Sequence, residues 1–100
     1  MKSLNKLREQ ANYYFNNYDE YIATVVVMEL DWMNLSNEEL EAAIERIKYV
    51  YNHVDYATIQ GAATSYGYWL QDLREGNLEL EEGETEEDNW KTWYSYSDWR

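Results

Sequence analysis

The sequence predicts a mainly α-helical protein: a small bundle of three to four helices, with a short β-hairpin or a further helix at its C-terminal end. Its 100 residues include no Pro and only four Gly, which is typical of long regular elements with few sharp loops. Apolar residues recur at three- and four-residue steps, as they do along one face of a helix. A helix-capping motif precedes the clearest of these patterns.

The clearest helix is expected from Ser36 to about Asn52. Ser36 is followed three residues later by Glu39, so the two can form a capping box. Leu35 and Leu40 flank the cap and can pack as a hydrophobic staple. Acidic side chains in the first turn are stabilised by the positive end of the helix dipole. The predicted apolar face consists of Leu40, Ala43, Ile44, Ile47, Val50, Tyr51 and Val54.

A second helix is expected from Asp55, acting as its N-cap, to about Glu75. Arg74 in the last turn and Gly76 beyond it are typical stop signals. The small residues at positions 61–65 would let another helix approach closely, and we interpret them as a tight helix crossing. Contact between two copies of the chain is the alternative. The apolar stripe is Ile59, Ala62, Ala63, Tyr66, Trp69, Leu70 and Leu73.

The N-terminal third also has helical spacing. Asn16 and Asn17 interrupt its pattern, and Asp19 can cap a following segment. The β-branched run 25–27 would also suit a strand, but helical spacing and the lack of flanking turn residues favour a helix. The two stripes are Leu4, Leu7, Ala11, Tyr14, Phe15 and Tyr18, and then Tyr21, Ile22, Val25, Val26 and Leu30.

The character of the chain changes after Gly76. We expect residues 1–76 to form the helical core of a single domain spanning 1–100, and residues 77–100 to form an acidic and aromatic C-terminal segment. Seven acids and no base lie between Leu78 and Asp88. Aromatic residues then crowd the last eleven positions: Trp90, Trp93, Tyr94, Tyr96 and Trp99.

The terminal aromatic side chains are expected to dock on their own domain or on a partner. Leaving one large apolar side chain unburied costs about 1.5–3 kcal/mol. The two-residue spacing of Leu78/Leu80 and of Thr92/Tyr94/Tyr96 is typical of strands and favours a hairpin around Gly83. The spacing of Trp90, Trp93 and Tyr94 favours a short helix instead, and the sequence leaves both open.

The net charge is the strongest functional signal. Twenty acids against eight bases give −12. A field of this sign repels nucleic acids and anionic membranes. It attracts basic surfaces, including those with which other proteins hold nucleic acid. We therefore expect a basic nucleic-acid-binding protein or complex as partner, with no direct binding to nucleic acid or membrane. Solubility alone is the alternative reason for the charge.

Several function classes lack the residues that they need. The chain has no Cys, so disulfides, thiolate metal sites and a Cys nucleophile are excluded, which suits a reducing compartment. No apolar segment follows the basic residues at the N-terminus, as a signal peptide would require. The longest apolar stretch, residues 22–28, is too short to span a bilayer. A soluble, cytoplasmic protein is the expectation.

No catalytic or metal-binding motif is recognisable. His53 is the only histidine, and no Ser nucleophile motif accompanies it. A calcium loop with Gly83 at its sixth position would need an acid where Leu78 stands. There is no glycine-rich phosphate loop. The acids are too many for any one pair to stand out, so we expect a protein that is not an enzyme and has no metal or cofactor.

Carboxylates on a rigid frame can substitute for phosphates. On a strand, Glu79 and Glu81 would lie about 6–7 Å apart, and on a helix Glu41 and Glu45 would lie about 5–6 Å apart. Nucleic acid carries one phosphate per ~3.4 Å of rise on each strand, so a site rich in Lys and Arg could accept such a row. The candidate contacts are Glu79, Glu81, Glu82, Glu84, Glu86, Glu87 and Asp88, with Glu38, Glu41 and Glu45 as a second row.

Two further groups of residues are candidates for partner binding. Asp19, Glu20, Glu29 and Asp31 could form a third acidic patch, depending on the fold. Trp90, Trp93 and Trp99 are candidate anchors, because Trp is enriched at binding hot spots. Core packing is the equally weighted alternative for these three.

In size, acidity and the stretch from Glu79 to Asp88, the chain resembles the small acidic inhibitors of bacteriophages and mobile elements, namely anti-CRISPR and anti-restriction proteins. They share no common sequence motif, so no functional residue is carried over. The resemblance implies a non-enzymatic blocker that occupies the nucleic-acid-binding groove of a host defence complex, in the host cytoplasm. The alternative hypothesis is a helical interaction or regulatory subunit that uses an aromatic surface, with homo-oligomerisation open.

Overall fold

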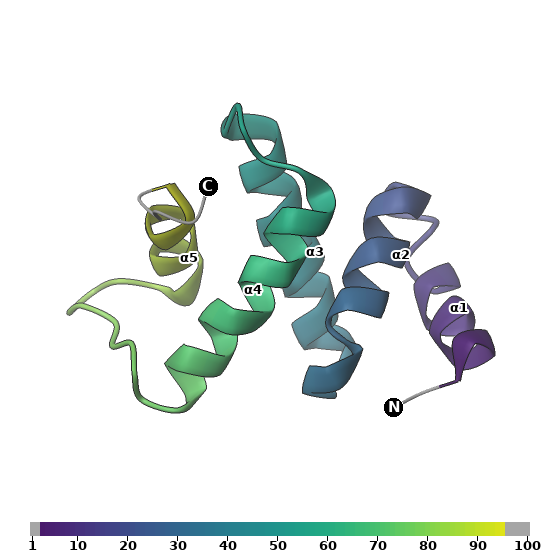
Figure 1. The fold of residues 1–100 in the computed structure, drawn as a ribbon, viewed down its shortest axis with the longest axis horizontal. Coiled ribbons are helices and arrows are strands. Elements are labelled where there is room, and N and C mark those ends of the chain that lie inside the picture. The colour runs from purple at the N-terminus through teal and green to yellow at the C-terminus, as the bar shows by residue number, and fades with distance from the viewer. Residues whose placement is uncertain (1–2, 96–100) are drawn as a thin grey trace.

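The computed structural model describes residues 3–95, which form five α-helices and one short 3₁₀ helix (Figure 1). Within that range there is no β-strand. The predicted mainly helical class is confirmed, but the helices outnumber the predicted three to four. The elements are α1 (Leu4–Asn12), α2 (Glu20–Glu29), η1 (Asp31–Met33), α3 (Asn37–His53), α4 (Ile59–Arg74) and α5 (Glu86–Ser95).

The two longest helices, α3 and α4, pack against each other at the centre of the molecule. Helix α2 contacts both of them and carries α1 on its other side, while α5 contacts both from the opposite flank. Figure 1 therefore shows α1 and α5 at opposite ends of the long axis, which measures 39 Å. None of the helices between residues 3 and 95 combines the length and the hydropathy that a membrane-spanning helix needs.

Side-chain caps define where two of these helices begin. The predicted capping box of α3 is confirmed: the Ser36 hydroxyl accepts from the Glu39 amide at 3.2 Å, and the Glu39 carboxylate accepts from the Ser36 amide at 3.0 Å. Leu35 and Leu40 beside it are both buried. The predicted cap of α2 is also confirmed, because Asp19 accepts from two amides of the first turn.

Helix α4 begins later than predicted. Its N-cap is Thr58, whose hydroxyl accepts from the Gly61 amide at 3.0 Å, and not Asp55. Residues 54–58 connect α3 to α4, because the chain must reverse direction before α4 can pack along α3. The predicted apolar face of α3 is right except at Tyr51, which is exposed.

The N-terminal third forms two helices. Turns over residues 13–17 separate α1 from α2. The β-branched run 25–27 is helical, as predicted, and Val26 and Val27 are fully buried. Because α2 contacts α1, α3 and α4, this burial outweighs the modest helix propensity of valine.

The small residues at positions 61–65, predicted to form a tight helix crossing, are buried in part: Ala62, Ala63 and Ser65 are buried, whereas Thr64 is exposed. Ala62 and Ala63 are fully buried, and α4 packs against both α2 and α3. A small side chain at such a position lets two backbones approach closely.

The predicted hairpin around Gly83 is wrong within the described residues, and the alternative of a short helix is confirmed. Residues 78–85 contain no strand, and α5 begins at Glu86. Helical spacing places Trp90 and Tyr94 one turn apart on the same face, where both are buried. Strand alternation would have placed Trp93 and Tyr94 on opposite faces.

An aromatic cluster joins α5 to α4. The Trp90 ring lies 5.0 Å from Tyr66, 5.5 Å from Trp69 and 5.3 Å from Tyr94, measured between ring centroids. These are favourable distances for aromatic pairs. The expectation that the terminal aromatics dock on their own domain therefore holds for Trp90 and Tyr94, whereas Tyr96 and Trp99 lie outside the described residues.

Candidate acidic interaction surface

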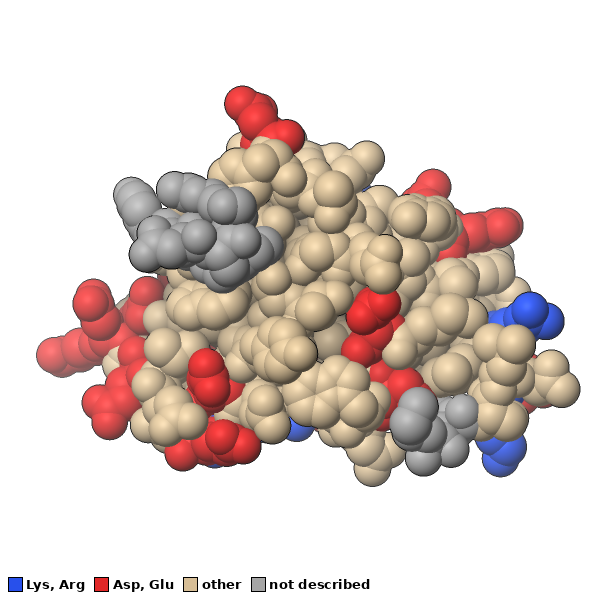
Figure 2. Space-filling model, viewed as in Figure 1, with Lys and Arg blue, Asp and Glu red and all other residues tan. Residues whose placement is uncertain are grey.

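The principal acidic segment is the connection between α4 and α5. Gly76 and Gly83 both have φ of +80°, a left-handed conformation that glycine adopts without strain. The backbone amides of Asn77 and Leu78 donate to the carbonyl of Asp72, which fixes the start of the connection. In Figure 2, acidic side chains gather at this end of the molecule.

Glu84 has a structural role within the connection. Its carboxylate accepts from the Glu81 amide at 3.0 Å and from the Asn89 side chain at 3.1 Å. Asn89 in turn accepts from the Trp69 indole at 2.8 Å. The turn over residues 81–84 is therefore linked through α5 to the core. Glu84, predicted as a contact residue, is partly buried and positions its neighbours.

Three acids of the run begin a helix. The Thr85 hydroxyl accepts from the Asp88 amide at 3.1 Å and caps α5, so Glu86, Glu87 and Asp88 form the first turn. Negative charge is favourable there because it faces the positive end of the helix dipole. Glu86 also lies 3.5 Å from Arg46 of α3, and Glu87 lies 3.7 Å from Lys91.

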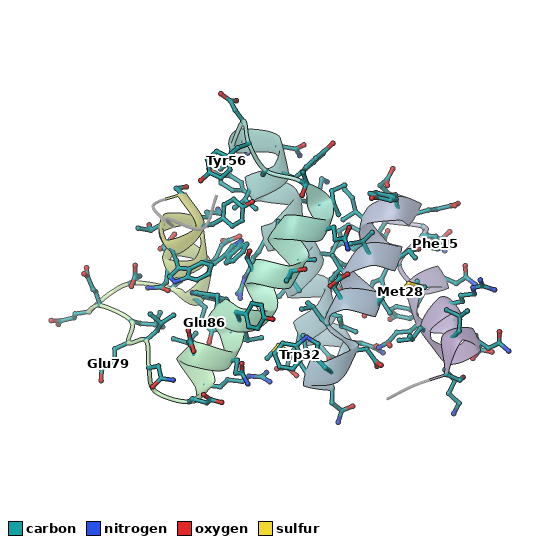
Figure 3. All side chains as sticks on the ribbon, viewed as in Figure 1. Phe15, Met28, Trp32, Tyr56, Glu79 and Glu86 are labelled. Atoms are coloured by element: carbon teal, nitrogen blue, oxygen red, sulfur yellow. The ribbon has the colours of Figure 1, made fainter. Side chains whose placement is uncertain are left out.

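The remaining acids of the run have no such partner. Within residues 3–95, the carboxylates of Glu79, Glu81, Glu82 and Asp88 make no ion pair and are exposed. In Figure 3, Glu79 points outward from the connection, whereas Glu86 lies beside α4. The predicted strand spacing of Glu79 and Glu81 is wrong, because this segment is irregular. Hydrogen bonds at residues 77–78 and 81–84, rather than a sheet, fix the backbone of this connection.

The second predicted row is divided between two sides of α3. Glu38, Glu41 and Glu45 are exposed on α3. Glu41 accepts from the Tyr18 hydroxyl at 3.3 Å, so this carboxylate faces the segment between α1 and α2, whereas Glu38 lines the hollow between α3 and α4 that also contains Glu86. Arg46, which pairs with Glu86, lies about 140° from Glu41 around the helix. The structure therefore keeps Glu41 and Glu45 apart from the α4–α5 connection and brings Glu38 near Glu86 at the start of α5.

The third predicted patch is not a single patch. Asp19 and Glu20 lie at the start of α2, and Glu29 and Asp31 lie at or beyond its end. Ten helical residues separate the two pairs by about 15 Å at 1.5 Å per residue. At the end of α2, Glu29 contacts α4, where it accepts from Thr64 at 3.2 Å.

Of the predicted Trp anchors, Trp90 belongs to the core. Its exposed fraction is 0%, and its indole donates to the Arg46 carbonyl at 3.1 Å. It therefore presents no surface to a partner in this structure, because its ring and its donor are both satisfied within the fold. Trp93 is partly buried and stacks on Trp90. Trp99 lies outside the described residues.

An ion-paired hollow lies between α3 and α4, at the start of α5. It has a volume of about 230 Å³ and is lined by Glu39, Arg46, Arg74 and Glu86 among others. Arg74 pairs with Glu39, and Arg46 pairs with Glu86. The hydrogen bond from the Ser36 amide lowers the pKa of Glu39, and Arg74 lowers it further. Both arginines of this hollow are thus neutralised by carboxylates of the chain.

The described residues contain little else that could carry chemistry. His53, which ends α3, stacks on Tyr49 and shares a 2.8 Å hydrogen bond with its carbonyl. Among residues 3–95, no three acids or histidines converge as metal ligands would.

An exposed aromatic pair was missed in the sequence. Trp32 of η1 and Tyr68 of α4 lie 6.3 Å apart between ring centroids, and both are exposed. They are 36 positions apart in the chain, so no local pattern connects them. The one available signal was Gly67, a helix-breaking residue in the middle of a strong helical pattern.

The fold and this surface describe a small, strongly acidic helical protein whose charges are held on an aromatic core. Comparison with protein-family models, with curated proteins and with solved structures finds no match.

Proposed function

We propose that this chain is a non-enzymatic acidic inhibitor that occupies the nucleic-acid-binding surface of a host protein or complex. The class is that of the small inhibitors that phages and mobile elements direct against CRISPR or restriction systems. The observation that carries this proposal is the α4–α5 connection, where Glu79, Glu81 and Glu82 are exposed and unpaired among the described residues. The net charge of −12 supports it.

The fixed shape of this segment supports a binding role. A flexible acidic tail must be ordered when it binds, and each ordered residue costs about 1–2 kcal/mol of backbone entropy. Here the relay from Glu84 through Asn89 to Trp69 orders the turn in advance. Preorganised carboxylates can therefore meet lysine and arginine side chains at lower cost.

The α3 row is a secondary contact in this proposal. Because Glu41 and Glu45 face away from α5, one flat partner surface would not cover both rows. A partner that encloses nucleic acid in a groove could contact the connection with one wall and α3 with the other. Long-range attraction from both rows would also raise the rate of association.

The experiment compares two variants with the same change in net charge. One carries Glu79→Gln, Glu81→Gln and Glu82→Gln; the control carries Glu9→Gln, Glu20→Gln and Asp55→Asn, all exposed. DNA-binding proteins are captured from a bacterial lysate at low salt and identified. Displacement of a fluorescent double-stranded DNA from each captured protein is then measured by anisotropy.

The wild-type chain should displace the DNA, and its affinity should fall steeply as salt rises. Loss of three contacts should weaken displacement by about tenfold or more, while the control variant should retain most of its affinity. Equal affinities of the two variants would show that only net charge matters. Undiminished binding in half-molar salt would contradict the proposal as a whole.

A second candidate function is a helical interaction or regulatory subunit, favoured by the exposed Trp32–Tyr68 pair. In that case Trp32→Ala should weaken binding more than any acid change, with little dependence on salt. Sedimentation of the chain alone tests whether the partner is a second copy.

A further inference from the structure

The most conspicuous uncharged feature of the surface is the Trp32–Tyr68 pair. Trp32 is 48% exposed and Tyr68 is 59% exposed. Their ring centroids are 6.3 Å apart, and their planes are inclined at 44°. Figure 3 shows Trp32 beside α4. The pair thus forms a contact between η1 and α4, and both rings remain exposed to solvent.

Gly67 makes room for this arrangement. A Cβ atom at position 67 would lie 2.9 Å from Cζ2 of Trp32 and 3.2 Å from Cδ2 of Leu30. Glycine in the middle of a helix costs about 1 kcal/mol relative to alanine. The chain accepts this cost at a buried position of α4, and the indole ring rests directly on the helix backbone. The exposed ring is therefore held in place before any partner arrives.

The charges around the pair are negative. Glu29 lies one turn before Trp32, and its carboxylate accepts from Gln60 at 3.4 Å and Thr64 at 3.2 Å. Thr64, which donates to Glu29, precedes Tyr68 by one turn of α4. Asp72 follows Tyr68 by one turn. Acids therefore lie before and after Tyr68 along this face of α4.

Basic residues are scarce on the same elements. Helix α2 and η1 contain no Lys or Arg, and α4 contains only Arg74, which pairs with Glu39. In Figure 2 the face is largely uncharged, with red carboxylates set into it.

We propose that the Trp32–Tyr68 pair, together with Glu29, is a docking surface for an arginine side chain of the partner protein. A planar guanidinium can stack on an aromatic ring while donating two hydrogen bonds to a carboxylate. Lysine offers a point charge and no plane to stack. The inference rests on the proposed function in taking the partner to be basic, and it identifies a second contact besides the α4–α5 connection.

A second copy of the chain suits this surface less well. Each copy carries a net charge of −12, so two copies repel each other. The acids beside the rings would add to that repulsion, whereas they attract a guanidinium. Charge complementarity therefore selects a cationic occupant.

The test uses defined peptides instead of an unidentified partner. The ¹⁵N-labelled chain is titrated with the blocked pentapeptide acetyl-Gly-Arg-Gly-Arg-Gly-amide, and separately with its lysine analogue, at physiological salt. The cross-peaks to follow are the Trp32 indole N–H, the Tyr68 amide, and the amides of residues 79–82. The Trp32 and Tyr68 signals should move at lower concentrations of the arginine peptide than of the lysine peptide.

Matched variants separate the pair from general acidity. Tyr68→Ser should weaken binding at this surface by about twofold to fivefold, the loss expected for one exposed cation–π contact, and Glu29→Gln should act in the same direction. Tyr21→Ser is the control, because Tyr21 is 61% exposed and also follows acids, Asp19 and Glu20. Circular dichroism verifies that each variant is folded.

The outcomes distinguish this inference from the proposed function. Shifts spread evenly over all exposed acids, or equal effects of Tyr68→Ser and Tyr21→Ser, would overturn the arginine site. The DNA-displacement experiment with the Glu79, Glu81 and Glu82 variant would be unaffected by that result. Conversely, tight arginine binding at Trp32 without any DNA displacement would retain this site and overturn the nucleic-acid mimic.

Discussion

Identical side chains have different roles in this molecule, and the surroundings of each residue determine the role. Glu79 and Glu84 belong to the same acidic run. Glu79 is exposed at the edge of the connection, whereas Glu84 accepts two hydrogen bonds that shape the turn. Neutralising Glu84 would therefore combine a change of charge with a change of structure. A clean test of the charges leaves Glu84 unaltered.

Gly67 gives a prediction at the scale of one residue. In Gly67→Ala, the added methyl group would meet the Trp32 ring at 2.9 Å and should displace it. The free energy of unfolding should change by less than about 1 kcal/mol, because alanine gains about that much helix propensity and offsets the contact. Urea denaturation measures the free energy of unfolding, and the NMR shift of the Trp32 indole N–H reports the displacement of the ring.

Two outcomes would contradict this account of Gly67. An unchanged indole shift would mean that the ring does not rest on the helix backbone. A large loss of stability would mean that Trp32 cannot move and belongs to the core.

At the scale of the element, the start of α5 explains much of the acidic run. Thr85 caps the helix, and three acids occupy its first turn. These charges stabilise the helix N-terminus. Part of the acidic run from which a binding surface was predicted therefore serves to begin α5. Glu79, Glu81 and Glu82 lie outside the helix and are not explained in this way.

Removing the cap tests how far α5 orders the connection. Thr85→Ala should lower the free energy of unfolding by about 1 kcal/mol, a typical cost of losing an N-cap. Amide hydrogen exchange should increase over residues 81–90, because the turn and the helix start share this junction. Thr92→Ala is the matched control: Thr92 is exposed in the same helix and caps nothing. Similar exchange in both variants would show that the cap does not hold the connection.

At the scale of the whole molecule, the tyrosines act together as a pH-sensitive part of the core. Burial raises the pKa of Tyr14, Tyr66 and Tyr94 above the ordinary value of 10.0. It also raises the pKa of Tyr18, to which Glu45 and Glu41 add. In each case the folded protein holds the phenol proton more tightly than the unfolded chain does. The stability that this provides is complete below pH 10 and is lost as pH rises further.

Ionisation of these tyrosines should therefore leave the melting temperature unchanged up to about pH 9 and lower it above pH 10. Tyr18→Phe should make that fall shallower, because it removes one of the titrating hydroxyl groups. Thermal unfolding followed by circular dichroism from pH 8 to 11.5 provides the measurement, with tyrosinate absorbance recorded in parallel. If the melting temperature of the variant fell with pH at the same rate as that of the wild type, the pKa of Tyr18 would be the same in the folded and unfolded states.

The sequence by itself determined the helical class, the capping box at Ser36, the cap at Asp19 and the apolar faces of the two long helices. All of these depend on residues within a few positions of one another, where period and cap chemistry act locally. It also determined the net charge of −12, which is independent of the fold.

Only the tertiary structure decided the form of the C-terminal segment, because local alternation suited a hairpin while burial of Trp90 and Tyr94 against α3 and α4 required a helix. It alone placed Glu41 and Glu45 of α3 beside Tyr18, away from α5, and brought Trp32 to Tyr68. Such pairings join residues far apart in the chain, and they depend on how the helices pack around the core rather than on any spacing along the sequence.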